Sequence, residues 1–276
     1  MKDIRYLTDH YDEKIRRINE IGAPVNFVFI TDLHSRLNHW ATLHDPEFSG
    51  KPYELAVNHV ASVQYILDRC PGITHAICGG DIGNDYSHDP AEIRASHDEI
   101  MEALYALSVP VHCCIGNHDD AVTISTLRGD NNIPFAILPD ELHRRCMRNN
   151  PTDKNYYFLD HPNELWRFVF LNSIDRPYFK DENDRYTLQP ALCISMEQVE
   201  WLKNDALKTE RRILIFSHAP LRNEGVFGTC DGPLYIKPHD DTYISETAFD
   251  VFSIKDNVMY ITRFGAGEDR IATLLR

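Results

Sequence analysis

The chain has 276 residues, of which 43% are apolar, and this balance is typical of a globular protein with one large core or two modest ones. The formal net charge of −14 disfavours non-specific binding to DNA, RNA or anionic lipid, so any anionic ligand would require strong local positive charge. The first 20 residues lack the apolar run of a signal peptide or membrane span, and we therefore expect a cytoplasmic protein without a membrane partner.

The seven cysteines form an odd-numbered set without a Cys-x-x-Cys pair. This pattern fits a reducing compartment better than a disulfide framework. Cys78, Cys113 and Cys114 lie in apolar runs, so we interpret them as buried hydrophobic residues rather than as catalytic thiols. No linker or repeat interrupts the chain, and we predict one domain over residues 1–276.

Helical and strand patterns alternate through the first half of the chain. Charges between apolar residues at spacings of three and four predict an amphipathic helix that ends at Gly22 and Pro24. The patterns that follow predict a strand over 25–30, a helix over 54–69, a strand over 74–78, a helix with Asp89 as N-cap, and a strand over 111–115. This order predicts an α/β protein, and open α/β sheets bind ligands at the carboxyl ends of their strands.

The second half is less regular. Residues 121–153 lack a clear period, and we interpret them as a helix and loops over the site. Ser195 and Gln198 form a capping box that predicts the start of a helix. The remaining predicted elements are two strands of a second sheet over 156–159 and 167–171, a strand over 212–216, and a terminal hairpin between 249 and 264.

Polar side chains follow four of these strands. Asp32 and His34 are two residues apart, so both can point the same way towards one metal ion. The two carboxylate oxygens of Asp81 can bridge two cations, while Asn117 and His218 offer an oxygen and a nitrogen to the second cation. This mixed donor set suits manganese, iron or zinc better than calcium.

A pair of divalent ions about 3.5–4 Å apart would lower the pKa of a bound water and hold a phosphate group in place. Their charge would also leave the centre positive within an acidic chain. Each short motif alone is a weak signal, since Asp-x-His and Gly-Asp are common in turns. The four motifs in order, each at the end of an apolar strand, are a much stronger one.

The sequence resembles the calcineurin-like metallophosphoesterase family in four successive motifs: Asp32-Leu33-His34, Gly80-Asp81, Gly116-Asn117-His118-Asp119 and Ser217-His218-Ala219-Pro220. The resemblance implies a four-layer sandwich of two mixed sheets flanked by helices. It implies that Asp32 and His34 bind the first metal, that Asp81 bridges, and that Asn117 and His218 bind the second. It further implies hydrolysis of a phosphomonoester or phosphodiester by a metal-bound hydroxide.

By the same resemblance, His118 is the histidine that hydrogen-bonds the phosphate and helps the leaving oxygen depart. A histidine in this position can donate a proton when a carboxylate holds it in the charged form. Asp85 and Asp119 are both candidates for that carboxylate, and the sequence does not choose between them.

The chain departs from the family pattern after its fourth motif. Members continue to a strand that ends in Gly-His-x-His, and no such motif occurs between residues 221 and 249. His239, with Asp240, is a candidate partial substitute for the missing histidines. A scaffold or binding protein that keeps the fold but has lost part of its metal cage is therefore the alternative to an enzyme. A nucleotide-binding protein is a poorer interpretation, because no P-loop or dinucleotide fingerprint is present.

Overall fold

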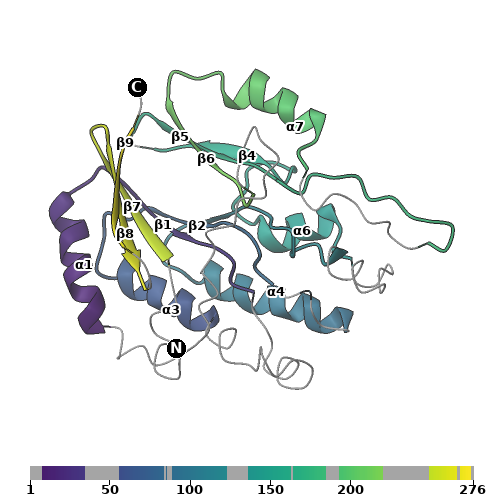
Figure 1. Ribbon diagram of the computed structural model, residues 1–276, viewed down its shortest axis with the longest axis horizontal. Helices are drawn as coiled ribbons and strands as arrows, with labels where there is room; N and C mark the ends of the chain where they lie inside the picture. The colour runs from purple at the N-terminus through teal and green to yellow at the C-terminus, as the bar shows by residue number, and fades with distance from the viewer. Residues whose placement is uncertain are drawn as a thin grey trace.

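A computed structural model describes residues 8–34, 56–83, 85, 89–122, 136–162, 164–184, 193–219, 249–265 and 268–274 (Figure 1). In chain order the elements are α1 (Thr8–Ile21), β1 (Val25–Ile30), α3 (Ala56–Leu67), β2 (His75–Cys78), α4 (Pro90–Tyr105), β3 (Val111–Cys113), α6 (Pro139–Cys146), β4 (Tyr157–Asp160), β5 (Trp166–Phe170), α7 (Met196–Trp201), a π-helical turn (Leu202–Ala206), β6 (Arg212–Phe216), β7 (Phe249–Lys255), β8 (Val258–Phe264) and β9 (Arg270–Thr273).

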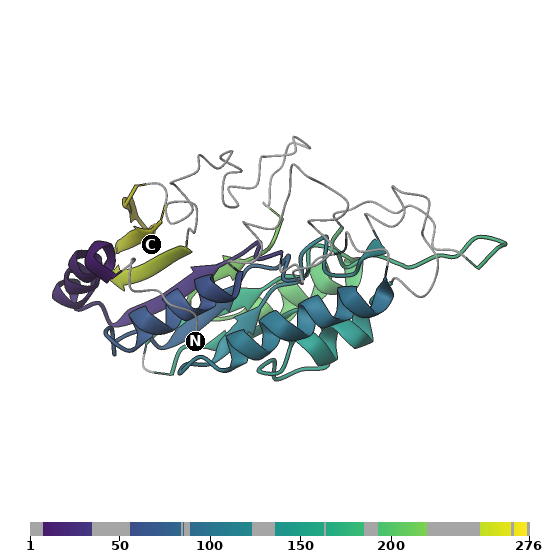
Figure 2. The same ribbon diagram turned by 90° about the horizontal axis from the view of Figure 1, so that it is seen from below.

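Two mixed sheets form the centre of the molecule. The six-stranded sheet has the order β3-β2-β1-β7-β8-β9, in which β1, β2 and β3 are parallel and β7 runs antiparallel to β1. The three-stranded sheet has the order β4-β5-β6, with β5 antiparallel to β4 and parallel to β6. Helices α3 and α4 lie along the six-stranded sheet and α7 covers the three-stranded one (Figures 1 and 2). The predicted four-layer α/β sandwich is therefore confirmed.

Aromatic side chains fill the space between the sheets. The Phe27 ring stacks on Phe252 at a centroid distance of 5.0 Å and meets Phe168 and Phe216 edge-on at 5.4 and 5.5 Å. Because side chains alternate along a strand, the neighbours of Phe27 in β1 face the helix layer instead. On the far side of the three-stranded sheet, Val169 packs in a cluster with residues of α7 and the π-helical turn. Both faces of each sheet thus contribute to the core.

Most predicted elements are confirmed. Asp89 is the N-cap of α4 and accepts a hydrogen bond from the Ala91 N–H, and the hairpin is formed by β7 and β8. The short edge strand β9 was not predicted, because its side chains are mostly exposed and carry no apolar pattern. Among the described cysteines, those at 70, 78, 113, 114 and 146 are buried free thiols. Across the described ranges, no helix combines the length and apolarity required to cross a membrane.

One prediction for the second half needs correction. Ser195 is the N-cap of α7, but the Gln198 side chain does not return to it. Instead the Gln198 amide donates to the Asn172 carbonyl at 2.9 Å and accepts from the Asn172 N–H at 3.0 Å, because the neighbouring sheet offers buried backbone groups. Within 121–153, where we predicted a helix and loops over the site, residues 123–135 lie outside the described part of the chain, and the described helix α6 contacts α4.

Three histidines meet between the sheets, around the amino-terminal end of β2. The ring of His75 lies 5.6 Å from that of His112 and 5.8 Å from that of His161. His75 and His112 are both buried, and Phe168 packs against His75 at 5.8 Å. Burial, with repulsion between these rings, lowers the pKa of His75 and of His112 from 6.5 to about 4.

We expect the free energy of unfolding to fall as the pH drops from about 6.5 towards 4. In that window the unfolded chain binds protons that the folded histidines, whose pKa is lowered, do not bind. Each fully shifted histidine contributes on the order of 1–3 kcal/mol to this loss. His112→Phe removes one of these groups, so the free energy of unfolding should depend less steeply on pH in this variant. The measurement is urea unfolding followed by circular dichroism at a series of pH values.

His143→Gln provides the control, because His143 lies on α6 outside this cluster. It should leave the pH dependence unchanged. If the free energy of unfolding depended equally on pH in wild type and His112→Phe, the loss of stability in acid could not be assigned to the histidine cluster.

Candidate metal centre

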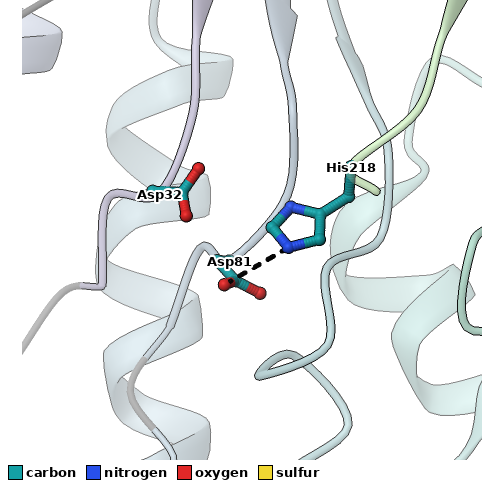
Figure 3. Close-up of side chains that lie close together, drawn as sticks. All are labelled: Asp32, Asp81 and His218. Carbon is teal, nitrogen blue, oxygen red and sulfur yellow. Dashed lines mark ion pairs between the residues drawn. The ribbon is translucent and has the colours of Figure 1, made fainter. Parts of the chain in front are cut away.

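The candidate site lies where the carboxyl ends of four strands meet. Asp32, Asp81 and Asn117 follow β1, β2 and β3, whose parallel order brings their ends to one edge of the six-stranded sheet. His218 follows β6 and reaches this edge from the other sheet, as Figure 3 shows. Ligand atoms of Asp32, Asp81 and His218 all lie within 4.8 Å of one another. The two sheets therefore build the site together.

The loops after β1 and β2 are fixed by hydrogen bonds that continue beyond the strands. The Asp32 N–H donates to the Gly80 carbonyl at 2.9 Å, and the His34 N–H donates to the Asp81 carbonyl at 3.0 Å. Asp32, His34 and Asp81 have φ angles of +56°, +42° and +53°, a left-handed conformation that side chains other than glycine seldom adopt. Such strain is typical of functional sites, where the surrounding structure holds it in place.

His218 is oriented so that a ring nitrogen faces two oxygen acceptors. Its Nδ1 donates to the Gly79 carbonyl at 3.1 Å, which leaves a lone pair on Nε2 of the neutral ring. That Nε2 lies 3.0 Å from Asn117 Oδ1 and 3.4 Å from Asp81 Oδ2. With the ring neutral and Asp81 ionised, these three atoms are electron-pair donors that face one another, and a cation among them could be coordinated by all three. The donor set therefore fits a metal ion.

A second group of donors shares the same carboxylate oxygen. His34 Nε2 lies 3.5 Å from Asp81 Oδ2 and 3.9 Å from Asp32 Oδ1. The other Asp81 oxygen accepts the His118 N–H at 2.9 Å, and the other Asp32 oxygen accepts the Thr31 hydroxyl at 2.7 Å. Asp81 Oδ2 thus lies close to two imidazoles, so a single oxygen, rather than the two carboxylate oxygens that we predicted, is placed to bridge two cations, because Oδ1 is engaged by the His118 N–H.

The electrostatics of this carboxylate also favour a cation. Burial raises the pKa of Asp81 to about 7, and the nearby rings of His218 and His118 only partly offset that rise. A buried carboxylate is stabilised in its ionised form by an adjacent positive charge. Divalent ions at the positions facing Oδ2 would supply that charge.

His118 is held by Asp85, which settles the choice that the sequence left open. His118 Nδ1 lies 2.9 Å from Asp85 Oδ1, and the Asp85 side chain is fully buried. Burial disfavours the charged ring, but the hydrogen bond and negative charge of Asp85 outweigh it and raise the pKa of His118 to about 9. The ring centroids of His118 and His34 are 5.1 Å apart, so this histidine lies beside the candidate metal centre.

Asp119 has a different set of partners. Its carboxylate accepts hydrogen bonds from the backbone N–H groups of Asp81, Ile82 and Gly116 at 3.0, 2.7 and 2.7 Å. It therefore joins the loop after β2 to the loop after β3. The prediction that Asp119 could orient His118 is replaced by this backbone role.

All five predicted ligands are thus brought to one place, and the predicted catalytic residue His118 lies beside them. The sequence reasoning did not identify Thr31 or the Gly79 carbonyl, which orient Asp32 and His218. Nothing in residue type marks either group, since the contacts arise only when the strands pair. His239 and Asp240 lie outside the described residues, as does the segment between 220 and 248.

The fold and the site together define a metallophosphoesterase architecture. The chain belongs to the calcineurin-like phosphoesterase family, whose model matches residues 25–248. Among solved structures, a dimetal phosphatase from Danio rerio is similar, with a TM-score of 0.55 and 16% sequence identity over 92% of this chain and 100% of that one. At this identity the likeness concerns the fold. No curated protein sequence matches the chain. Family membership supports metal-dependent phosphoester hydrolysis in general terms.

Glycines allow the two central loops to touch. A Cβ at Gly116 would lie 2.1 Å from Asp81 Oδ1 and 2.3 Å from the Asp81 N, both too close for any real contact. Gly116→Ala should therefore displace Asp81 and weaken Mn²⁺ binding at least tenfold in equilibrium dialysis. Gly72→Ala is a matched control, because its Cβ would meet only Asn26 Nδ2 at 3.4 Å. Unchanged binding in Gly116→Ala would contradict the described loop contact.

Proposed function

We propose that this chain hydrolyses a small phosphomonoester or phosphodiester at a centre of two divalent metal ions. The observation that carries the proposal is the shared Asp81 Oδ2, which faces His34 at 3.5 Å and His218 at 3.4 Å. We assign Asp32 and His34 to one ion and Asn117 and His218 to the other. Manganese, iron and zinc all suit these donors.

The protein groups have separable tasks in this proposal. When bound, the ions would activate a water molecule and stabilise charge on the phosphate oxygens. Asp81 would hold both ions, and its orientation is fixed by the hydrogen bond that its Oδ1 accepts from the His118 N–H at 2.9 Å. The Nδ1 of His118 is engaged by Asp85, which orients the ring, and Nε2 is the nitrogen that would donate a proton to the leaving oxygen.

The charge of the site supports an anionic substrate despite the net charge of −14. The candidate ligands include two carboxylates, those of Asp32 and Asp81, while two divalent ions would bring four positive charges. The charge of His118, whose pKa is raised by Asp85, is balanced by that carboxylate, so the positive charge of the centre would come from the ions. A small phosphate ester therefore meets a locally positive centre within an acidic protein, which we propose acts in the cytoplasm.

The alternative is a scaffold or binding protein that keeps the fold without catalysis. The observation that favours it is the lack of Gly-His-x-His in the sequence, since this motif completes both metal sites in family members. Metal loading and turnover separate the two functions. A scaffold needs neither, whereas the enzyme needs both.

We expect purified protein titrated with Mn²⁺ to saturate at two ions per chain and then to hydrolyse an aryl phosphate or a bis-aryl phosphate. The measurement combines equilibrium dialysis of Mn²⁺ with release of the coloured phenolate. Binding of two ions with turnover excludes the scaffold function, and which of the two esters reacts distinguishes monoesterase from diesterase activity. Folded protein that neither binds Mn²⁺ nor turns over these esters would refute the enzyme.

His118→Asn should lower kcat by about 10²- to 10⁴-fold, the usual contribution of a general acid. It should leave the Mn²⁺ stoichiometry unchanged, because the side chain is not among the proposed ligands. An ester with a good leaving group, which needs little protonation, should lose less activity than one with a poor leaving group. His143→Asn on α6 serves as the control and should retain full activity. Equal losses for both leaving groups would contradict the role as acid.

A further inference from the structure

The carboxylate of Asp119 is the point at which the two central loops of the site are joined. It is completely buried. One oxygen, Oδ2, accepts both the Asp81 N–H at 3.0 Å and the Gly116 N–H at 2.7 Å. The other, Oδ1, accepts the Ile82 N–H at 2.7 Å. Three backbone donors from loops that follow different strands therefore end on a single side chain.

These bonds hold Asp81 on both sides of its strained backbone. The Asp81 φ angle of +53° is unfavourable for a residue with a side chain. Two of the three bonds to Asp119 come from the Asp81 N–H and from the Ile82 N–H that follows it. The orientation of the peptide groups around Asp81 is thereby fixed, and its side chain is directed at His218 and His34.

Only a carboxylate satisfies all three donors. Asparagine has nearly the same shape but offers one acceptor oxygen and an NH₂ group. If its oxygen took the place of Oδ2, the NH₂ group would face the Ile82 N–H. If its oxygen took the place of Oδ1, the NH₂ group would face the N–H groups of Asp81 and Gly116. Either orientation leaves at least one buried backbone donor without an acceptor, which is costly in a closed interior.

The three hydrogen bonds to Asp119 form a backbone clamp around Asp81. His97 of α4 supports this clamp from the helix layer. Its Nε2 lies 3.8 Å from Asp119 Oδ1, and the ring is completely buried. The ring also fills the space beside Gly83, where a Cβ would lie 2.1 Å from His97 Cδ2. His97 therefore packs under the loop after β2 and blocks movement of the Asp119 carboxylate towards α4.

We propose that Asp119 is a positioning residue: it fixes the orientation of the bridging Asp81 carboxylate before any metal binds. This inference rests on the proposed function, because the Asp81 geometry that Asp119 would fix is the one that two cations would use. Both oxygens of the Asp119 carboxylate accept backbone N–H groups, so we do not assign Asp119 as a metal ligand. Its effect passes through the peptide groups on either side of Asp81.

The test compares Asp119→Asn with Asp250→Asn. Asp250 is also a buried aspartate, but it accepts from Arg263 and Arg270 on neighbouring strands and serves the terminal part of the sheet. We expect Asp119→Asn to weaken Mn²⁺ binding about 10- to 100-fold, as measured from the electron paramagnetic resonance signal of free Mn²⁺. Asp250→Asn should lower the melting temperature while leaving the Mn²⁺ affinity within twofold of wild type.

Amide hydrogen exchange on the metal-free protein provides the second measurement. Exchange at Asp81, Ile82 and Gly116 should be at least tenfold faster in Asp119→Asn and unchanged in Asp250→Asn. If wild type binds no Mn²⁺, the proposed function fails, while the exchange rates still decide whether Asp119 clamps the loops. Wild-type Mn²⁺ affinity in Asp119→Asn, or equal weakening by both variants, would overturn the inference.

Asp119→Glu keeps the comparison available if Asp119→Asn does not fold. Glutamate retains two acceptor oxygens but displaces them by one methylene group. We expect it to bind Mn²⁺ more weakly than wild type and, where both variants fold, more tightly than Asp119→Asn. Unaltered affinity in Asp119→Glu together with unaltered exchange at the three amides would also overturn the inference.

Discussion

The buried carboxylate of Asp81 is the constraint on which the site depends. Its Oδ1 is engaged by the His118 N–H, while its Oδ2 faces His34 and His218 at 3.5 and 3.4 Å. Donor atoms that repel one another stay together only because the backbone around them is fixed by other bonds. A cation at this position would relieve the repulsion, so metal binding should also stabilise the folded chain. Stability and function are thus linked through one side chain.

The packing of the two sheets sets the geometry across that centre. Asp81 follows a strand of the six-stranded sheet and His218 follows a strand of the other. The distance between their side chains therefore depends on how the two sheets pack against each other. Phe27 and Phe216, whose rings meet at 5.5 Å, lie in the interface that fixes this spacing. Phe216 is only two residues before His218. Close packing tolerates little change in volume, so the aromatic interface determines the position of the imidazole.

The parts of the fold and site that the sequence predicted are those controlled by local patterns. Apolar runs located β1 and β2, and residues placed directly after strands located the candidate metal ligands, because parallel strands end at one edge. The partner of His118 was not predictable, since Asp119 is adjacent to it in sequence whereas Asp85 lies 33 residues away, and only the folded loops separate their roles. The side-chain contacts of Gln198 depended on a backbone 26 residues away. Tertiary contacts of this kind leave no periodic signal.

The missing Gly-His-x-His motif can be weighed against the chemistry that the described residues support. Asp32, His34 and Asp81 form one set of three donors, and Asp81, Asn117 and His218 form another. Catalytic metal sites commonly have three protein ligands and keep a position open for water or substrate, whereas closed four-ligand sites are structural. In the proposed assignment, loss of one imidazole from each ion would lower metal affinity but would leave three protein donors for each ion. The strain and the backbone clamp around Asp81 then matter more, because a cage with fewer ligands depends on having each of them already in place.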